Sequence, residues 1–157
     1  MNETSSAATG KHLSGKCLCG AISFTATANG GEVAACHCRM CRRWSGGVHL
    51  ALLSATDLAM EVEDNLAVYK SSDWGERCFG KSCRSNLFWR TQSSDHVPIM
   101  AGAINEEDRL TFTSQIFIER KPAYFDFANQ TTMETEADMI AKYAPQNQST
   151  NSEKQNG

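Results

Sequence analysis

Hydrophobic and polar residues alternate in five stretches of the chain, which is the pattern of strands that bury one face. These stretches lie at residues 21–26 (AISFTA), 48–53 (VHLALL), 66–70 (LAVYK), 86–89 (NLFW) and 110–119 (LTFTSQIFIE). Successive side chains of a strand point to opposite faces, so the alternation gathers the apolar residues on one face of a sheet. Turn-forming residues at 30–31 and 105–108 are expected to connect strands. The pattern therefore predicts a mainly β protein.

A different pattern, typical of a short helix, occupies residues 134–144 (ETEADMIAKYA). Thr132 or Thr135 can cap its N-terminus, and two glutamates lie in the first turn, where the helix dipole favours negative charge. Pro145 follows the last turn, as is common after the end of a helix. We therefore expect one short helix near the C-terminus of an otherwise β domain.

The composition along the chain indicates one folded domain with polar ends. A length of 157 residues suits a single domain. Residues 1–14 are small and polar and predict a flexible segment, and residues 144–157 carry no apolar anchor and predict a disordered tail. Residues 15–143 contain no linker-like composition, so we expect a single domain there. The start lacks the apolar run of a signal peptide, and no later run approaches a membrane span.

The overall charge narrows the range of partners. The net charge is −3 and the pI is about 5.8, so no positive field favours nucleic acid or an anionic membrane surface. No glycine-rich phosphate loop is present in the sequence, so nucleotide use is not indicated. A small-molecule substrate is the expected partner, and a homo-oligomer stays open because the free edges of an antiparallel sheet can pair.

Seven cysteines are the chemically distinctive feature of the sequence. Their number is odd, their spacings are short and no export signal precedes them, which argues against a secreted disulfide scaffold. We therefore expect a cytoplasmic protein with reduced thiols. Three of them, Cys36, Cys38 and Cys41, which we call the first cluster, are too close in sequence to pair comfortably with one another. Such clustering favours a bound metal ion, with redox-active thiols as the alternative.

Ligand counting divides the seven cysteines into a group of four and a group of three. Closed structural zinc sites use four protein ligands, whereas catalytic zinc sites use three and keep one position open. The first cluster would form the open site. The closed site would join the N-terminal strand to a later hairpin through Cys17, Cys19, Cys78 and Cys83. Zinc is the expected cofactor, at up to two ions per chain, because iron–sulfur clusters usually need four thiolates.

Three thiolates around a divalent ion carry a net charge of minus one, which makes the ion a poor activator of water. A further thiolate, brought by a substrate, is then the natural fourth ligand. Arg39, Arg42 and Arg43 flank the cluster and can offset its charge or bind the carboxylates of a thiol peptide. Arg42 and Arg43, together with Trp44, are the candidate substrate-binding residues. The alternatives are that the arginines are only solvated and that Trp44 covers an edge of the core.

Two histidines lie close to the first cluster in the sequence. His37 stands between two of the cysteines and, in an extended backbone, faces away from them, so we expect it at the surface. His49 lies in an alternating strand, where a half-buried and hydrogen-bonded imidazole is expected. Neither is among the predicted ligands.

Three motifs carry a resemblance to a known family: GKCLCGAISF (15–24), CHCRMCRRWSGG (36–47) and CRSNLFWR (83–90). With weaker similarity up to residue 126, the chain resembles the glutathione-dependent formaldehyde-activating enzyme family, also called the CENP-V/GFA family. The resemblance implies an Mss4-like fold of antiparallel sheets around zinc, with the first cluster as the catalytic zinc ligands. It also implies that Cys17, Cys19 and Cys83 hold a structural zinc. The implied activity, of the carbon–sulfur lyase class, joins formaldehyde and glutathione to S-(hydroxymethyl)glutathione.

The sequence departs from the family pattern just before and within the third motif. Gly80 stands where a cysteine is expected, and Arg84 replaces a glycine that can take a positive φ at little cost. A bulky residue in the left-handed conformation costs roughly 1–2 kcal/mol. Cys78, two residues earlier, is the candidate to replace the missing ligand; without it the structural zinc is weak, replaced or absent.

Two other classes of function stay open from the sequence. The protein could be a non-catalytic, zinc-braced binding module, although it lacks the basic extension expected of such a branch of the family. Alternatively, the first cluster could serve in thiol redox chemistry or in metal buffering. The substrate-thiol hypothesis, with glutathione or a similar small thiol as partner, accounts best for the number of ligands.

Overall fold

The computed structural model describes residues 10–143, most of which lie in strands and the loops between them. The strands are β1 (Lys11–Lys16), β2 (Ser23–Ala28), β3 (Glu32–Cys36), β4 (Leu50–Leu52), β5 (Ala55–Met60), β6 (Leu66–Lys70), β7 (Gly75–Gly80), β8 (Asn86–Thr91), β9 (Ile99–Met100), β10 (Thr111–Ile116) and β11 (Thr132–Glu134). The helices are α1 (Arg39–Ser45) and α2 (Glu136–Tyr143), with short 3₁₀ turns η1 (Ala101–Ala103), η2 (Glu107–Arg109) and η3 (Ile118–Arg120). The mainly β class with a short C-terminal helix is confirmed.

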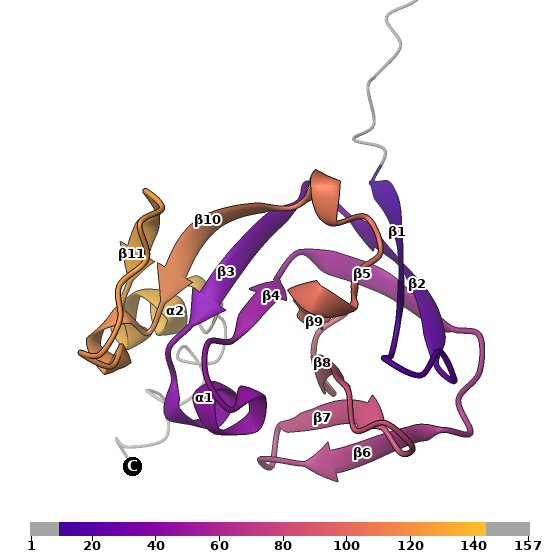
Figure 1. Ribbon diagram of the computed structural model, residues 1–157. Coiled ribbons are helices and arrows are strands. Elements are labelled where there is room, and N and C mark those ends of the chain that lie inside the picture. The colour runs from indigo at the N-terminus through magenta and orange to yellow at the C-terminus, as the bar shows by residue number, and fades with distance from the viewer. Residues whose placement is uncertain (1–9, 144–157) are drawn as a thin grey trace, which may run out of the picture.

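The strands form two sheets. A three-stranded antiparallel sheet has the order β1-β2-β5, and an eight-stranded sheet has the order β11-β10-β3-β4-β9-β8-β7-β6. β1 and β2 lie on the opposite side of the molecule from β10 and β11 (Figure 1). β10 pairs in parallel with both β3 and β11, so the larger sheet is mixed rather than purely antiparallel. Within residues 10–143, no helix is long and apolar enough to cross a membrane.

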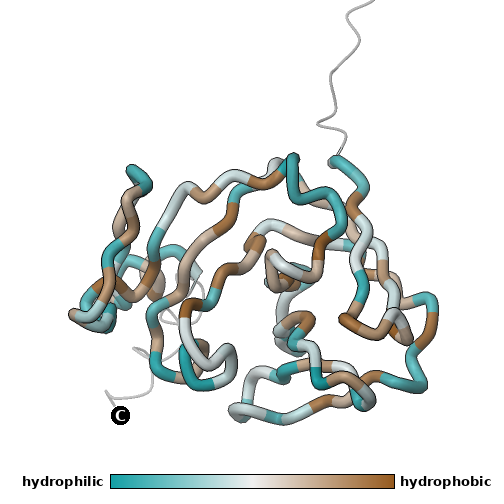
Figure 2. The backbone as a smooth tube through the Cα atoms, viewed as in Figure 1, coloured by the Kyte–Doolittle hydropathy of each residue, from teal (hydrophilic) through white to brown (hydrophobic). Residues whose placement is uncertain are grey.

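The core lies between the two sheets. Phe24 of β2 is buried against Phe88 of β8, with ring centroids 6.3 Å apart in an edge-to-face arrangement. Leu52, Leu87 and Ile99 of the larger sheet are also fully buried in this cluster. Each such side chain contributes about 1.5–3 kcal/mol by leaving water. The segments β3 and β4 are largely hydrophobic, whereas the loop that carries η2 is hydrophilic (Figure 2).

The alternating stretches in the sequence locate five of the strands. The stretch at 66–70 coincides with β6, and those at 21–26, 48–53, 86–89 and 110–119 overlap β2, β4, β8 and β10. The C-terminal helix begins at Glu136, two residues later than predicted, because Thr135 caps it. The Thr135 hydroxyl accepts from Asp138 N (3.2 Å), and the Asp138 carboxylate accepts from Thr135 N (2.8 Å).

The alternating stretches do not cover six of the strands, β1, β3, β5, β7, β9 and β11, or the helix α1. β1 begins at Lys11, so residues 11–14, which we assigned to a flexible segment, form part of a strand paired with β2. Its sequence, KHLSGK, contains a single large apolar residue, so it has no alternation of apolar and polar residues. The strand forms because its backbone pairs with β2. α1 has no buried residue and therefore no hydrophobic periodicity that would reveal it. Residues 1–9 and the predicted tail at 144–157 lie outside the described residues.

Candidate metal centres

The first cluster forms where a strand end meets a helix start. Cys36 is the last residue of β3, Cys38 is the N-cap of α1, and Cys41 lies in its first turn. Cys38 has extended backbone angles, and its sulfur accepts a hydrogen bond from Cys41 N at 3.4 Å. α1 ends at Gly46, whose positive φ of 74° allows its N–H to bond Arg42 O at 2.9 Å. The end of β3 and the first turn of α1 thus place the three sulfur atoms close together.

The geometry of the first cluster fits a zinc ion. Its three sulfur atoms all lie within 4.8 Å of one another. Bonds of about 2.3 Å in a tetrahedron place neighbouring sulfurs roughly 3.8 Å apart. Cys36 is buried, and Cys38 and Cys41 are half-buried. Among the described residues, no fourth histidine, cysteine or carboxylate joins the group, so these residues offer three candidate ligands, one fewer than a closed zinc site uses.

The thiols of the first cluster differ in acidity. Hydrogen bonds from Cys36 and Cys41 lower the pKa of Cys38 to about 2, and the nearby Arg77 acts in the same direction. The hydrogen bond to Cys38, together with burial, raises the pKa of Cys36. In the metal-free cluster, these pKa shifts place the negative charge on Cys38 and leave Cys36 and Cys41 protonated. Binding of zinc requires three thiolates and would release the remaining protons.

Arg77 of β7 is a residue of this site that the sequence analysis missed. Its side chain is 5% exposed, and its Nη2 donates to the Cys41 sulfur at 3.6 Å. The guanidinium lies 5.0 Å from the centroid of the Trp44 ring, a cation–π contact. Its Nη1 is buried and has no hydrogen-bond partner among the described residues. A lone arginine in a strand remote from the motif gives no sequence signal; only the pairing of the strands brings it here.

Trp44 and His49 form the neighbouring wall. Their rings lie 5.9 Å apart, and Trp44 O accepts from Asn86 Nδ2 at 3.0 Å, which attaches α1 to β8. His49 is buried rather than half-buried, and its Nδ1 is hydrogen-bonded to Ser45 Oγ at 2.6 Å. Burial, reinforced by the positive charge of Arg77, lowers the pKa of His49 to about 4. The imidazole is therefore neutral at neutral pH, and Arg77 is the cation of this wall.

His37 is a correction to the sequence analysis. We expected a surface imidazole, but His37 is 2% exposed and its Nε2 is hydrogen-bonded to Gln115 at 2.9 Å. The rings of Phe125 and Phe127 pack against it. The reason is the parallel pairing of β10 with β3, which brings the following segment over this face of the sheet. The local sequence around His37 cannot predict its burial, because Phe125 and Phe127 lie about ninety residues later in the chain.

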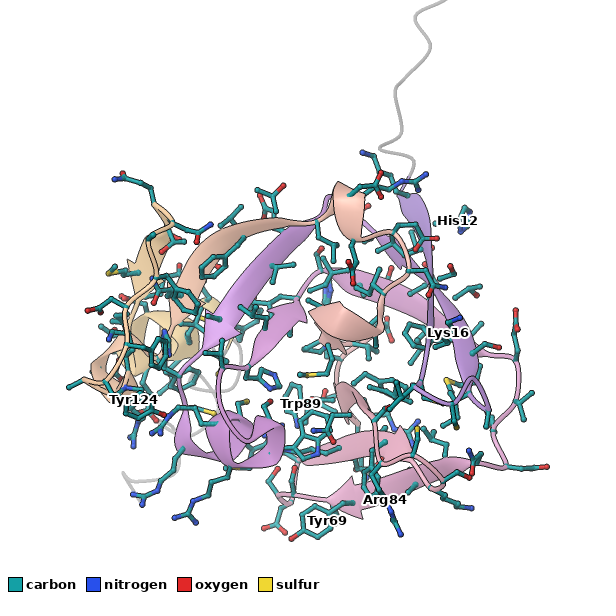
Figure 3. The ribbon with its side chains drawn as sticks, in the orientation of Figure 1. His12, Lys16, Tyr69, Arg84, Trp89 and Tyr124 are labelled. Atoms are coloured by element: carbon teal, nitrogen blue, oxygen red, sulfur yellow. The ribbon has the colours of Figure 1, made fainter. Side chains whose placement is uncertain are left out.

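The arginines of α1 border a separate hollow. A cavity of about 470 Å³ is lined by Arg39, Arg42, Arg43, Gly46, Gly47 and Tyr124. Arg42 is held in place because its Nε donates to His37 O at 2.9 Å. Tyr124 is exposed at the rim and lies on the same side of the molecule as α1 (Figure 3). Trp44 is not part of this lining: it faces Arg77, so the three candidate substrate-binding residues border two different places.

A second cluster consists of Cys17, Cys19 and Cys83, whose sulfur atoms also lie within 4.8 Å of one another. Cys17 and Cys19 lie in the turn after β1, where Gly20 takes a φ of 77° and Ile22 N donates to the Cys17 sulfur at 3.3 Å. Cys83 lies in the β7–β8 turn, and its hydrogen bond with Ser85 lowers the pKa of Cys83 to about 6. Two turns from distant parts of the sequence thus meet at these sulfurs.

Cys78 does not join the second cluster. It is fully buried in the hydrophobic core, opposite Phe88 on β8, and burial raises the pKa of its thiol to about 11. Strand residues two apart share a face but are separated by about 6.6 Å along the strand. Gly80 is the residue that faces the cluster, as the expected cysteine would, and Cys78 is too far along β7 to replace it. The prediction that Cys78 supplies the fourth ligand is therefore wrong.

Arg84, in the same turn, adopts the left-handed conformation with a φ of 62°, as the glycine of the family pattern would. Its side chain is exposed (Figure 3). Replacing Arg84 by glycine is expected to raise the free energy of unfolding by up to about 1 kcal/mol, because the Cβ clash of the left-handed conformation disappears. Urea denaturation measures the change. Arg84→Ala, which loses the same side chain but keeps the Cβ, should gain nothing, and an equal gain in both variants would contradict the explanation.

The fold and these two clusters define a small β protein with two groups of three cysteines, each of which could hold a metal ion. The sequence model of the glutathione-dependent formaldehyde-activating enzymes matches residues 12–120, and the chain belongs to this family. It is 33% identical over 122 residues to an uncharacterized lyase of Schizosaccharomyces pombe, covering 77% of this chain and 89% of that protein. A crystal structure of a Rhodobacter sphaeroides protein shares the fold at 20% identity and a TM-score of 0.51, covering 59% of this chain and 88% of the other.

Proposed function

We propose that this protein is a zinc-dependent carbon–sulfur lyase that acts on the adduct of a glutathione-like thiol with a small aldehyde such as formaldehyde. The observation that carries the proposal is the first cluster, which gathers three cysteine sulfurs within 4.8 Å of one another, with no fourth ligand from residues 10–143. Membership of the family and the similarity to a protein named a lyase support the same class of reaction.

The three-thiolate set of the first cluster determines which substrate group it suits. Three thiolates overcompensate the charge of a divalent ion, so the site favours a soft anionic guest over the ionisation of water. When bound, zinc would keep the substrate thiol deprotonated at neutral pH and fix its position. The half-buried Cys38 and Cys41 leave this position accessible, whereas Cys36 anchors the site in the core.

Arg77 supplies the positive charge of the site. In the synthetic direction, the substrate thiolate forms a bond to the carbonyl carbon, the C=O π electrons move to oxygen, and that oxygen takes a proton from water. Lysis is the reverse: the hydroxyl loses its proton, C=O re-forms and the carbon–sulfur bond breaks. Negative charge therefore develops on this oxygen in both directions. The free N–H of Arg77 Nη1, buried beside Cys41, is the donor that would stabilise it.

The arginine-lined cavity beside α1 would recognise the rest of the substrate. Arg39, Arg42 and Arg43 present three cations at its wall, which suits the carboxylates of a thiol peptide. Zinc held by the second cluster would connect the β1–β2 turn to the β7–β8 turn. We place the protein in the reducing cytoplasm, where its thiols and its thiol substrate stay unoxidised.

The proposal predicts catalysed exchange between formaldehyde and its glutathione adduct. Magnetisation-transfer NMR with ¹³C-formaldehyde measures this rate in the presence of the zinc-loaded protein. We expect a rate well above the spontaneous one, lost after chelation of zinc, and a weaker effect with cysteamine, which has no carboxylates. A rate equal to the spontaneous one with every thiol and aldehyde would leave a zinc-braced binding module or a thiol redox or metal-buffering protein as the function.

A further inference from the structure

Gly80 leaves one side of the second cluster without a ligand. A Cβ built at Gly80 would lie 3.2 Å from the Cys83 sulfur and 3.8 Å from the Cys17 Cβ. A side chain at this position would therefore point directly at the cluster. Gly80 itself has no positive φ, so its backbone conformation is open to any residue. The second cluster therefore lacks a fourth ligand because Gly80 has no side chain, and the backbone there is not distorted.

No other described side chain fills this place. Cys78 is buried in the core, and the group of ligand atoms within reach of one ion ends at Cys17, Cys19 and Cys83. The Ser85 hydroxyl lies 3.2 Å from the Cys83 sulfur, but it already accepts a hydrogen bond from Leu18 N at 2.9 Å. A neutral hydroxyl is also a poor zinc ligand beside thiolates. The described part of the chain therefore offers three donors where a closed site uses four.

The second cluster is also accessible from solvent. Cys19 is exposed and Cys83 is half-buried, whereas Cys17 is buried beneath them. A metal ion held by these sulfurs would lie at the surface, within reach of small molecules. In a closed structural zinc site, by contrast, four protein ligands surround the ion and leave no coordination position for a small molecule.

We propose that the second cluster is an open and exchangeable zinc site, in which Cys17, Cys19 and Cys83 bind the ion and a small molecule from solution, water or a free thiol, supplies the fourth ligand. The site differs from a structural zinc site in that its ion can be handed to a competing chelator. This inference concerns metal exchange and does not depend on the lyase activity of the first cluster.

The experiment isolates the second cluster and then closes it. In full-length protein carrying Cys38→Ser, the first cluster lacks a ligand, so zinc transferred to a colorimetric chelator comes from the second. Gly80→Cys in this background adds a fourth thiolate, and the backbone bonds of the turn, Gly80 N to Ser85 O and Arg84 N to Gly80 O, do not involve the altered side chain. We expect zinc transfer to slow by at least about tenfold. Gly80→Ala, which adds only the Cβ, should stay fast.

Cobalt(II) provides a second measurement that needs no change at Gly80. In the Cys38→Ser protein, addition of 2-mercaptoethanol should shift the visible absorption of bound cobalt, because the thiol enters the open position. The inference is overturned if the second cluster binds no metal, if zinc leaves the Gly80→Cys protein as fast as its parent, or if the cobalt spectrum ignores the thiol. Activity of the otherwise unaltered protein, measured separately, tests the lyase proposal on its own.

Discussion

Replacing Cys38 by serine is expected to remove zinc from the first cluster and to lower the thiol-dependent lyase activity by at least about 10³-fold. Two cysteines cannot hold zinc as three do, and without the ion the substrate thiol is neither ionised nor positioned. The fold should survive, because Cys38 is the N-cap of α1 and serine is among the best N-cap residues. Metal analysis should show the loss of one zinc per chain, with an unchanged circular dichroism spectrum.

Cys78→Ala is the matched control for this substitution. Cys78 is buried in the core and is not among the grouped sulfurs of either cluster, so its loss should lower stability modestly and leave zinc content and activity intact. If the Cys38→Ser protein stayed fully active without zinc in the first cluster, the catalytic role of that cluster would be refuted. If it unfolded, Cys41→Ser, which removes a ligand outside the cap position, would provide the same test.

The second large effect is expected for Arg77→Met, which should lower kcat by about 10²-fold with little change in KM. Methionine is an unbranched apolar side chain that keeps the stem of arginine and suits the buried position, but it is shorter and supplies neither the charge nor the N–H donor. The loss should fall on kcat because negative charge on the substrate oxygen develops only as the reaction proceeds. Arg77→Lys should restore part of the rate, since it keeps the charge but not the guanidinium geometry.

Arg90→Met controls for the loss of an arginine from the same sheet. Arg90 on β8 is partly exposed and pairs with Glu76 at 3.0 Å, so its removal should change activity little and stability by less than about 1 kcal/mol. Steady-state kinetics and metal analysis of both variants separate the roles. An Arg77→Met protein with normal kcat, whatever its stability, would show that the buried guanidinium has only a structural role.

The sequence predicted those features that depend on residues a few positions apart. It did not predict contacts between segments that are distant in the chain. The β strands with apolar alternation and the two sets of closely spaced cysteines were predicted, because both patterns lie within a few residues. The residues that shape the first cluster are also local, since they include the end of β3, the N-cap at Cys38 and the turn at Gly46. The helix α1 was not predicted, because it has no buried residues and therefore no hydrophobic periodicity. The family pattern has a glycine at the position of Arg84, and the structure shows there the positive φ that a glycine adopts at little cost.

The remaining features depend on strand pairing across the sheets. Arg77 reaches Cys41 because β7 and α1 converge in space, and nothing in the sequence around either residue indicates this. His37 is buried by a segment that follows β10, and Cys78 is directed into the core by its pairing with β8. Arginine, histidine and cysteine each occur both at the surface and in the interior of proteins. In each of these three cases, the burial and contacts of the residue depend on a segment far away in the sequence.

The central claim is that the first cluster holds a zinc ion with one coordination position free for a substrate thiol. Anomalous X-ray diffraction at the zinc edge, on crystals of the native protein, tests it most directly. We expect a peak about 2.3 Å from the sulfurs of Cys36, Cys38 and Cys41, with no fourth protein atom bound to it. An absence of zinc there, or a fourth side chain occupying the free position, would contradict the account.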